Sequence, residues 1–579
     1  MKVVHNGLTE SSVTGAGGNG LRWKKRLSHA VIAAEETQSL HRKCSAPQNP
    51  DSALWGIAYW GQTAGNGPYF DSWIKVDEQT LTMGRDSFGR VPLYWVQVQQ
   101  VVWFASHFSL LLPIANAIEI SIPALYGYSC FSYVPTPLTP IAGIFAIPTG
   151  GEQTWTFRNG AIAAPHWQRS LEWQESPLPL QDEPTAINQL QTLLKDAIQR
   201  QIADLNPGSR RCLSFRWARL FHCGGFAGAI WSEGSCLHTG FWQCRNFRAF
   251  LRTGDRRLSQ NSPGAGRGNS PPNSASTDSH CSGVRPALWG WSDRSPLFLL
   301  GQVASQEVKV IFNGEGGDQL FAGWTNKPLI AASIYQTEHP SEQDFTQQYL
   351  RTFHRLWGYE SQIFQPEVYA QIQQWYPQEW LKDALDPAFS RSLLHRLRRA
   401  NLMLKGAQNI HPRATRLGLA HRLEVRSPFC DLSLAQWAFQ VPSEFYLRGS
   451  CEKYILKRAV EPWLPPETVW RPKRGMGVPL TFWCFDGLWH EVGRWLNPQH
   501  LQQEGIWQPT LATRIVLGEL GTIQGRRIGE SLWLLLMWQV WRRAVLREPV
   551  PRLSWHPLFS LPPWLGRLYL RFHRSIESW

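Results

Sequence analysis

The sequence predicts a β-rich amino-terminal domain followed by an α/β domain that becomes largely helical toward the carboxyl terminus. Apolar and polar residues alternate with period 2 in "QTLTMG" and "WVQVQQVVWFA", which is typical of half-buried strands. Residues 186–205, "AINQLQTLLKDAIQRQIADL", repeat apolar positions at helical spacing and predict a helix. A short apolar run, "VKVIF", then ends in the glycine-rich "NGEGGD", and helical patterns continue to about residue 546.

Composition indicates a globular protein of more than one domain. The chain has 579 residues, 43% of them hydrophobic, which is enough for two or three domains with sizeable cores. The beginning, "MKVVHNGLTE", is polar and unlike a signal peptide, and "LWLLLMWQVW" near the end is too short to cross a bilayer. We therefore expect a cytoplasmic protein with no membrane partner.

Changes in composition divide the chain. A stretch rich in proline, glutamine and glutamate, "QESPLPLQDEPT", predicts a linker, and the last residues are rich in proline and tryptophan. The expected segments are an uncertain amino-terminal segment 1–50, a β-rich domain 51–173, a linker 174–185, an α/β domain 186–546 and a tail 547–579.

Residues 209–294 have an anomalous composition. They contain twelve arginines, no lysine and four acids, within a chain of net charge +14, and five of its ten cysteines. A nucleic-acid-binding arm should mix lysine with arginine, and a metal site needs paired cysteines, whereas the spacings here are 11, 13, 8 and 37. A disordered linker accounts for "NSPGAGRGNSPPNSASTDS" but not for the Trp- and Phe-rich part before it. A fourth interpretation is a gene read in the wrong frame.

The strongest chemical pattern is the turn Asn313–Asp318. Glycines after a strand let backbone N–H groups approach an anion. Glu315 and Asp318 are three residues apart, so one carboxylate can act as a base while the other holds a metal. The same pattern also fits a polar turn with Asp318 in the first turn of a helix.

Two later segments carry charge. In "HRLEVRSPFCD" we expect Glu424 and Arg426 to form a surface ion pair of little energetic value. In "RPKRGMGVP", residues 471–479, three cations beside glycines and prolines predict either a phosphate-holding loop or a solvated surface.

Taken together, these segments resemble the asparagine synthase family. "NGEGGDQLFAGW", "LEVRSPFCD", "EKYILKRAVEPWLP" and "RPKRGMGVPLTFW" are similar, in that order, to S-G-E-G-x-D-E-x-F-x-G-Y, L-E-x-R-x-P-F-L-D, K-x-x-L-R-x-A and R-x-K-x-G-F-x-x-P of its synthetase domain. "LTMGRDSFGRVPLYW" resembles R-D-x-x-G-x-x-P-L-Y of its glutaminase domain. The resemblance covers roughly residues 54–205 and 296–545.

The resemblance implies a fold and a reaction. The fold is an α+β arrangement in which a degenerate glutaminase-like β-sandwich of the N-terminal-nucleophile (Ntn) type precedes an α/β synthetase domain of the adenine-nucleotide α-hydrolase type. The implied cofactors are ATP and Mg²⁺, which activate aspartate as an acyl-adenylate with release of pyrophosphate, before ammonia attacks to give asparagine and AMP. The implied partners are aspartate with glutamine or ammonia and no nucleic acid, and a homodimer is left open.

The motif match also implies catalytic and metal-binding roles. Glu315 is the base that assists ammonia, and Lys473 stabilises the departing pyrophosphate. Asp318 holds Mg²⁺.

Nucleotide contacts are implied at three more positions. Asn313 and Gly314 contact the nucleotide, and Lys453 contacts a phosphate. Asn313 stands where the family has serine, and Gln319 replaces the second acid of the family's D-E pair.

One family motif is absent. S-G-G-L-D-S-S, the loop that cradles the pyrophosphate of ATP, should follow the helix that ends near residue 205, where the arginine-rich segment stands. Shifted by one nucleotide, the degenerate codons of 212–227 allow V-F-L-S-G-G-L-D-S-S-I-V-A-A-L-L, and those of 286–290 allow L-P-F-G-D. We predict that residues 209–294 are out of frame and disordered, and that this chain as written lacks the ligase step.

The glutaminase half also departs from the family, whose nucleophile is an amino-terminal cysteine. Here Met1 is followed by Lys2 and the first cysteine is Cys44, so we expect no glutamine hydrolysis. Two alternatives stay open: a β-lactam synthetase-like ligase acting on another carboxylate, and a non-enzymatic basic protein that binds nucleic acid.

Overall fold

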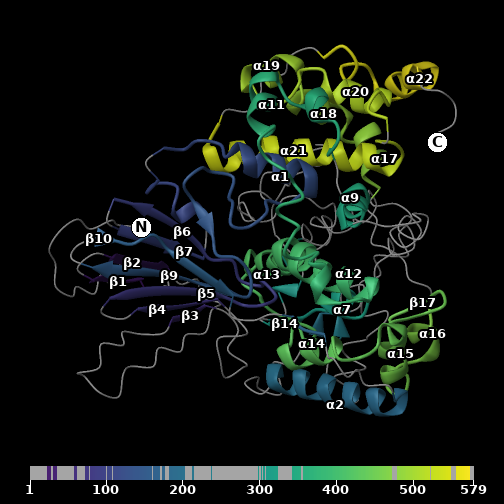
Figure 1. Cartoon of the computed structure of the whole chain (residues 1–579). Coiled ribbons are helices and arrows are strands. Elements are labelled where there is room, and N and C mark those ends of the chain that lie inside the picture. Colours follow the sequence, from purple (N-terminus) through teal and green to yellow (C-terminus); the bar gives the residue numbers. More distant parts are fainter. Residues whose placement is uncertain are drawn as a thin grey trace, which may run out of the picture.

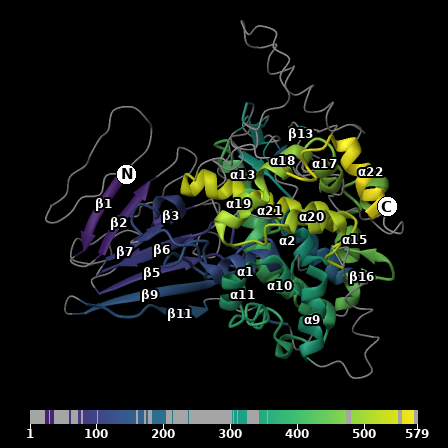
Figure 2. The ribbon, with the colours of Figure 1, turned by 90° about the horizontal axis from the view of Figure 1, so that it is seen from above.

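The computed structural model describes residues 72–202, 310–323, 342–471, 479–548 and 556–573, apart from short gaps within these ranges. It also describes three strands nearer the amino terminus, two short strands within 209–294 and isolated positions between 298 and 308. In both views the amino-terminal strands lie together beside a larger, mainly helical part (Figures 1 and 2). The arrangement is therefore a mixed helix and sheet fold in two parts.

The amino-terminal part contains two antiparallel sheets. The larger has the order β10-β9-β5-β4-β3, with β11 also paired to β9, and the smaller has the order β7-β6-β8. A separate hairpin joins β1 (Arg22–Leu27) to β2 (Ala30–Glu35). The strand bounds are β3 Ala58–Trp60, β4 Ser72–Val76, β5 Thr80–Arg85, β6 Tyr94–Val98, β7 Val101–Ala105, β8 Phe145–Ala146, β9 Gly151–Arg158, β10 Ala161–Ile162 and β11 His166–Arg169.

The predicted period-2 alternation is confirmed in β5, where Leu81 and Met83 are buried and Thr80 and Thr82, which alternate with them, are half-buried. These two side chains share one hydrophobic cluster with Trp155 of β9 and with Phe104 of β7 in the other sheet. Burial of this apolar surface stabilises the packing of the two sheets against each other.

The second part begins with α2 (Glu183–Ile202), so the predicted helix is confirmed, and it starts three residues earlier than expected. A parallel pair follows, β14 (Val310–Phe312) with β15 (Glu424–Arg426), in the register Ile311 opposite Val425. The short strands β12 (Cys212–Leu213) and β13 (Cys236–Leu237) are also parallel, and β12 contacts β14. The remainder of the predicted out-of-frame segment lies outside the described residues.

Helices cover this region on several sides. One core joins α2 and β14 to α7 (Gly317–Leu320), α14 (Leu432–Ala438) and α15 (Tyr454–Val460). A continuous helical run contains α12 (Leu393–Asn401), the π-helical segment η6 (Leu402–Ile410) and α13 (His411–Leu419). The remaining short elements are η1 Phe108–Leu110, α1 Ile122–Phe131, α9 Glu342–Phe353, α10 Glu360–Ile363, α11 Pro366–Ile372, η5 Pro387–Phe389, η7 Ser443–Phe445, β16 Leu447–Arg448, β17 Cys451–Glu452 and α16 Pro466–Val469.

The carboxyl-terminal helices surround α21 (Arg526–Leu546), which is buried over most of its length, as predicted for "LWLLLMWQVW". No helix among the described residues is both long and apolar enough to cross a membrane. The stretch expected as a tail contains α22, which is anchored by Arg567 through a hydrogen bond to the Phe485 carbonyl. The bounds are α17 Leu480–Phe485, α18 Trp489–Trp495, α19 Pro498–Glu504, α20 Leu511–Leu517 and α22 Pro563–His573.

The two parts meet at residues 85–90, which we call the junction turn. His411 at the start of α13 lies 2.7 Å from the Phe88 carbonyl through Nδ1. Because a carbonyl only accepts, Nδ1 carries the proton and Nε2 is the unprotonated nitrogen of the neutral ring. Burial is the largest cause that lowers the pKa of His411; the hydrogen bond to Phe88 opposes it, the charges of Arg90 and Arg413 add to it, and the pKa falls to about 4.

This burial predicts acid sensitivity. Since the pKa of His411 is lower in the folded chain than in the unfolded chain, protons favour the unfolded state below about pH 6.5. The contribution of neutral His411 to the free energy of unfolding is complete above about pH 6.5 and is lost as the pH falls toward 4. Replacement by glutamine, which can still donate to Phe88, should reduce the loss of unfolding free energy between pH 7 and pH 5 by about 2 kcal/mol. Urea unfolding of both proteins at the two pH values measures this, and an equal loss in both would contradict it.

Candidate functional site

The turn after β14 is held by three hydrogen bonds around Asn313, one to β15, one to Ser427 directly after β15 and one within the turn. The Asn313 amide donates to the Arg426 carbonyl at 2.9 Å. The Asn313 side-chain oxygen accepts from the Ser427 hydroxyl at 2.6 Å and from the Glu315 amide at 3.2 Å. Asn313 is buried, so these bonds are shielded from water and define the path of the chain toward Asp318.

The expected backbone cradle for an anion is not present at three amides of this turn. The Asn313 amide donates to Arg426, and the Glu315 amide donates to the Asn313 side chain. The Gly317 amide donates to the Gly314 carbonyl at 3.3 Å. Because its oxygen already accepts two bonds, the NH₂ group of Asn313 is the remaining polar group of that side chain. Side-chain donors, rather than these three amides, are therefore the groups that this turn can offer to a nucleotide.

Both predicted carboxylates are partly accessible. Glu315 is half-buried, and the Asp318 side chain is 24% exposed at the start of α7. The buried Cys430 thiol lies 3.7 Å from the Glu315 carbonyl. Burial raises the pKa of Cys430, so it stays protonated and acts as a weak donor rather than a nucleophile.

Lys453 lies against Asp318, with 3.0 Å between Nζ and Oδ1. Its side chain is 1% exposed, and its backbone has a φ of 56° as it caps α15. Gly323 closes the other side, since a Cβ there would stand 1.8 Å from Asp318 Oδ1 and 2.2 Å from Lys453 Cε. The residue expected to contact a phosphate is thus held in an ion pair with the expected metal ligand.

The residues present fit a magnesium ion held mainly by its substrate. Among the residues that the structure describes, no group of three or more His, Cys, Asp or Glu side chains could hold a metal. Mg²⁺ is commonly bound by one or two carboxylates together with substrate phosphates and water. The carboxylate of Asp318 is partly exposed, and one of its two oxygens faces Lys453, so it can supply one such ligand.

Glu424 and Arg426 form a buried pair, so the expected surface ion pair is wrong. Arg426 is 1% exposed, and its Nε and Nη2 both lie 2.7 Å from Glu424 Oε1. Arg426 also donates to the Gln201 carbonyl near the end of α2. The pair lies inside because β15 is packed between α13 and β14, which the alternating pattern "LEVR" does not reveal.

Sequence reasoning missed two polar groups beside the site. Ser427 holds Asn313, as described above. Asp431 caps α14 by accepting from the Leu434 amide at 3.1 Å and also accepts from Arg200 at 2.7 Å. An aspartate just before a helical pattern is a helix-start signal that identifies Asp431 as a cap. No local signal indicates Arg200, which is 231 residues away along the chain.

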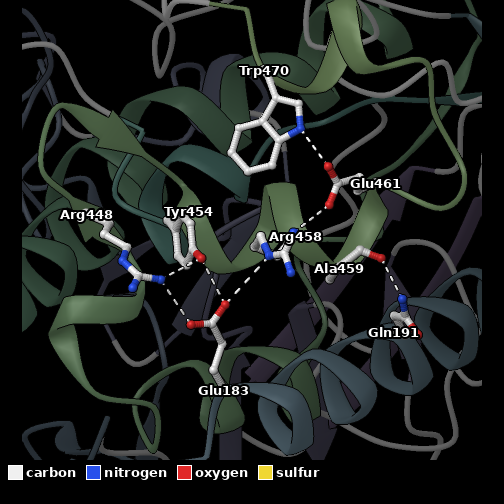
Figure 3. A network of polar contacts seen from close by, with 8 residues as sticks. All are labelled: Glu183, Gln191, Arg448, Tyr454, Arg458, Ala459, Glu461 and Trp470. Carbon is white, nitrogen blue, oxygen red and sulfur yellow. Dashed lines mark hydrogen bonds and ion pairs between the residues drawn. The ribbon is translucent and has the colours of Figure 1, made fainter.

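A polar network holds α15, and with it Lys453, against the beginning of α2 (Figure 3). Glu183 accepts from the Tyr454 hydroxyl at 2.9 Å and from Arg448 at 3.2 Å. Farther along the same helices, Gln191 donates to the Ala459 carbonyl at 2.8 Å. The helix that follows the linker therefore fixes the element that carries Lys453.

The same network extends toward the basic loop 471–479. Arg458 donates to Glu461 at 2.7 Å, and the Glu461 carboxylate also accepts from the Trp470 indole at 2.9 Å (Figure 3). Trp470 immediately precedes that loop. Lys473, the expected pyrophosphate contact, lies outside the described residues.

The ion pair between Asp318 and Lys453 predicts that replacing one member lowers the free energy of unfolding more than replacing the other. Replacing Asp318 with asparagine removes a charged partner from a buried ammonium, which should cost about 3 kcal/mol of unfolding free energy. Replacing Lys453 with methionine should cost less, because the apolar chain fills the space and the more exposed Asp318 can be hydrated. Urea unfolding of both single variants and the double variant measures the pair. A larger loss for Lys453→Met than for Asp318→Asn would contradict this account.

Two family models match the chain. The model described as "Asparagine synthase" matches residues 288–543, and the one described as "Glutamine amidotransferase domain" matches residues 64–167. The glutamine amidotransferase match falls on the amino-terminal part of the fold, and the asparagine synthase match falls on the second part.

Curated relatives agree. The chain is 22% identical to asparagine synthetase [glutamine-hydrolyzing] 1 of Bacillus subtilis over 518 residues, covering 81% of this chain and 76% of the relative. It is 35% identical over 123 residues to asparagine synthetase [glutamine-hydrolyzing] 3 of the same organism (21% of this chain, 19% of the relative). It is 24% identical over 207 residues to asparagine synthetase [glutamine-hydrolyzing] 1 of Saccharomyces cerevisiae (34% and 26%). With both domain types present in order, the chain belongs to the asparagine synthase family.

Proposed function

We propose that the functional form of this protein makes asparagine from aspartate, ATP and an ammonia source, releasing AMP and pyrophosphate through an acyl-adenylate. The observation that supports this most is the turn Asn313–Asp318, which leaves the carboxyl end of β14 with two accessible carboxylates. Parallel strands in open α/β sheets place their ligands beyond this end.

Within this proposal each side chain of the turn has a distinct task. Glu315 takes the proton that the ammonia nitrogen loses as it bonds to the activated carbonyl carbon, while AMP departs with the C–O bond electrons. The Asn313 NH₂ group is available to donate to the nucleotide, beside the backbone of Gly314. Asp318 would hold Mg²⁺, which when bound would neutralise charge on the phosphates.

Two cations complete the proposed site. Lys453 balances the charge of Asp318 from the buried side, and the motif K-x-x-L-R-x-A assigns it a phosphate contact. Lys473, three residues after Trp470 in the sequence, is assigned the pyrophosphate from the motif R-x-K-x-G. A cation at that position stabilises the negative charge that develops on the leaving group.

We further propose that residues 209–294 are read out of frame. In support, the two family matches end at 167 and begin at 288, so most of the anomalous segment lies between them. Its first codons, shifted by one nucleotide, allow the missing S-G-G-L-D-S-S motif shortly after β12, which contacts β14. Burial of the arginines of this segment without partners would be costly. The chain as written therefore lacks the ATP loop and the ligase step.

The prediction is tested with two proteins: the chain as written and a chain whose gene is restored by a one-nucleotide shift near the codons for 209 and 294. We expect pyrophosphate release that depends on aspartate and ammonium from the restored chain and none from the chain as written. In the restored chain, Glu315→Gln should lower asparagine formation by about 10²–10⁴-fold.

Each outcome separates two explanations. Ligase activity of the chain as written, or genomic sequencing that confirms both junctions in frame, would exclude the frame shift. Pyrophosphate release from the restored chain with another carboxylate but not with aspartate would overturn the assignment of substrate.

A further inference from the structure

The junction turn, residues 85–90, reaches from the glutaminase-like part into the two elements that flank the candidate site. Asp86, inside the turn, accepts from the amides of Phe88 and Arg90 at 2.9 Å, which fixes its backbone. Arg85, Asp86 and Arg90 are all at most 5% exposed. The turn is therefore a preformed, buried unit rather than a flexible surface loop.

Arg90 connects the turn to β15. Its Nη2 donates to the Val425 carbonyl at 3.0 Å. The next two residues of the chain, Arg426 and Ser427, supply the carbonyl and the hydroxyl that hold Asn313. Three consecutive residues thus connect the Arg90 guanidinium to the side chain that orients the Glu315 amide.

Arg85 and Gly89 connect the turn to η6. Arg85 Nη2 donates to the Ala407 carbonyl at 3.3 Å and to the Gly89 carbonyl at 2.9 Å. Gly89 has a φ of 66°, and a Cβ there would stand 2.2 Å from the Ala407 oxygen. The neighbouring Gly406 packs closely on Gln319, which follows Asp318 in α7.

The two connections lead to the two ends of the turn Asn313–Asp318, one at Asn313 and the other at Gln319, which directly follows the turn. β15 holds the start of the turn at Asn313, and η6 packs on its end at Gln319. Hydrogen bonds from a charged donor are stronger than those between neutral groups, and these are shielded from water. The glutaminase-like part is thus hydrogen-bonded to the two elements that contact the ends of the turn.

We propose that Arg90 is a positioning residue for Glu315, acting through Val425–Ser427 of the second part, and that this task of the glutaminase-like part is separate from glutamine hydrolysis. The importance of Glu315 rests on the proposed function, but the mechanical link does not. It can be tested on the chain as written, without turnover.

The test is hydrogen exchange of the full chain, followed by mass spectrometry of peptides covering 310–320. Arg90→Met should speed exchange of the amides of 311–317 about tenfold, because the charged hydrogen bond to Val425 is lost. Exchange in α21 should stay unchanged, and Arg90→Lys, which keeps one charged donor, should restore most of the protection. Arg399→Met is the matched control, since Arg399 is also buried and donates to a backbone carbonyl, that of Asp383, away from the turn.

The outcomes are distinct. Unchanged exchange at 311–317 in Arg90→Met would overturn the proposal, and so would equal acceleration there and in α21, since that indicates general loss of stability. If Arg90→Met does not fold, Arg90→Gln, which removes the charge but keeps a neutral donor, takes its place. Exchange at 311–317 should then be faster than in the unsubstituted chain and in Arg399→Met, and equal exchange in Arg90→Gln and Arg399→Met would overturn the proposal. Absence of asparagine formation in the restored chain would refute the proposed function and leave this result unaffected.

Discussion

The carbonyl of Arg426 and the hydroxyl of Ser427 hold Asn313 in place, and the conformation of the candidate site follows from these two bonds. They exist because β14 and β15 pair in parallel, with Phe312 opposite Arg426, so that the chain leaves β14 directly beside Ser427. The Arg426 side chain is then directed inward, where it needs Glu424 and the end of α2 as partners. A short parallel ladder thus determines the turn, the buried ion pair and the position of α2.

Parts of this arrangement can be predicted from the sequence. The helix α2 and the strands around "QTLTMG" follow from periodicity, and the strand before "NGEGGD" follows from a short apolar run that ends in glycines. The identity of Glu315 and Asp318 as accessible carboxylates also follows from local pattern.

Contacts between distant segments could not be predicted. Glu424 and Arg426 alternate with apolar residues, which is typical of a strand with one solvated face. Both are buried because the strand pairs with β14 and is covered by α13, and neither neighbour is encoded nearby. The same limit applies to Lys453, whose partner Asp318 precedes it by more than a hundred residues, and to Arg90, which binds a strand of the other part.

The run α12–η6–α13 has one more consequence. Arg398 of α12 donates to the carbonyls of Leu320 and Ala438 within the synthetase part, whereas His411 of α13 contacts Phe88 in the amino-terminal part. In an α-helix each residue turns the helix by about 100°, whereas π-helical segments contain more residues per turn. The segment η6 therefore sets the angular phase between the two ends of the run. Removal of one residue from η6 would rotate His411 and its neighbours by about a quarter of a turn relative to Arg398. The helical run could then no longer make the Arg398 bonds in the synthetase part and the His411 contact with Phe88 at the same time.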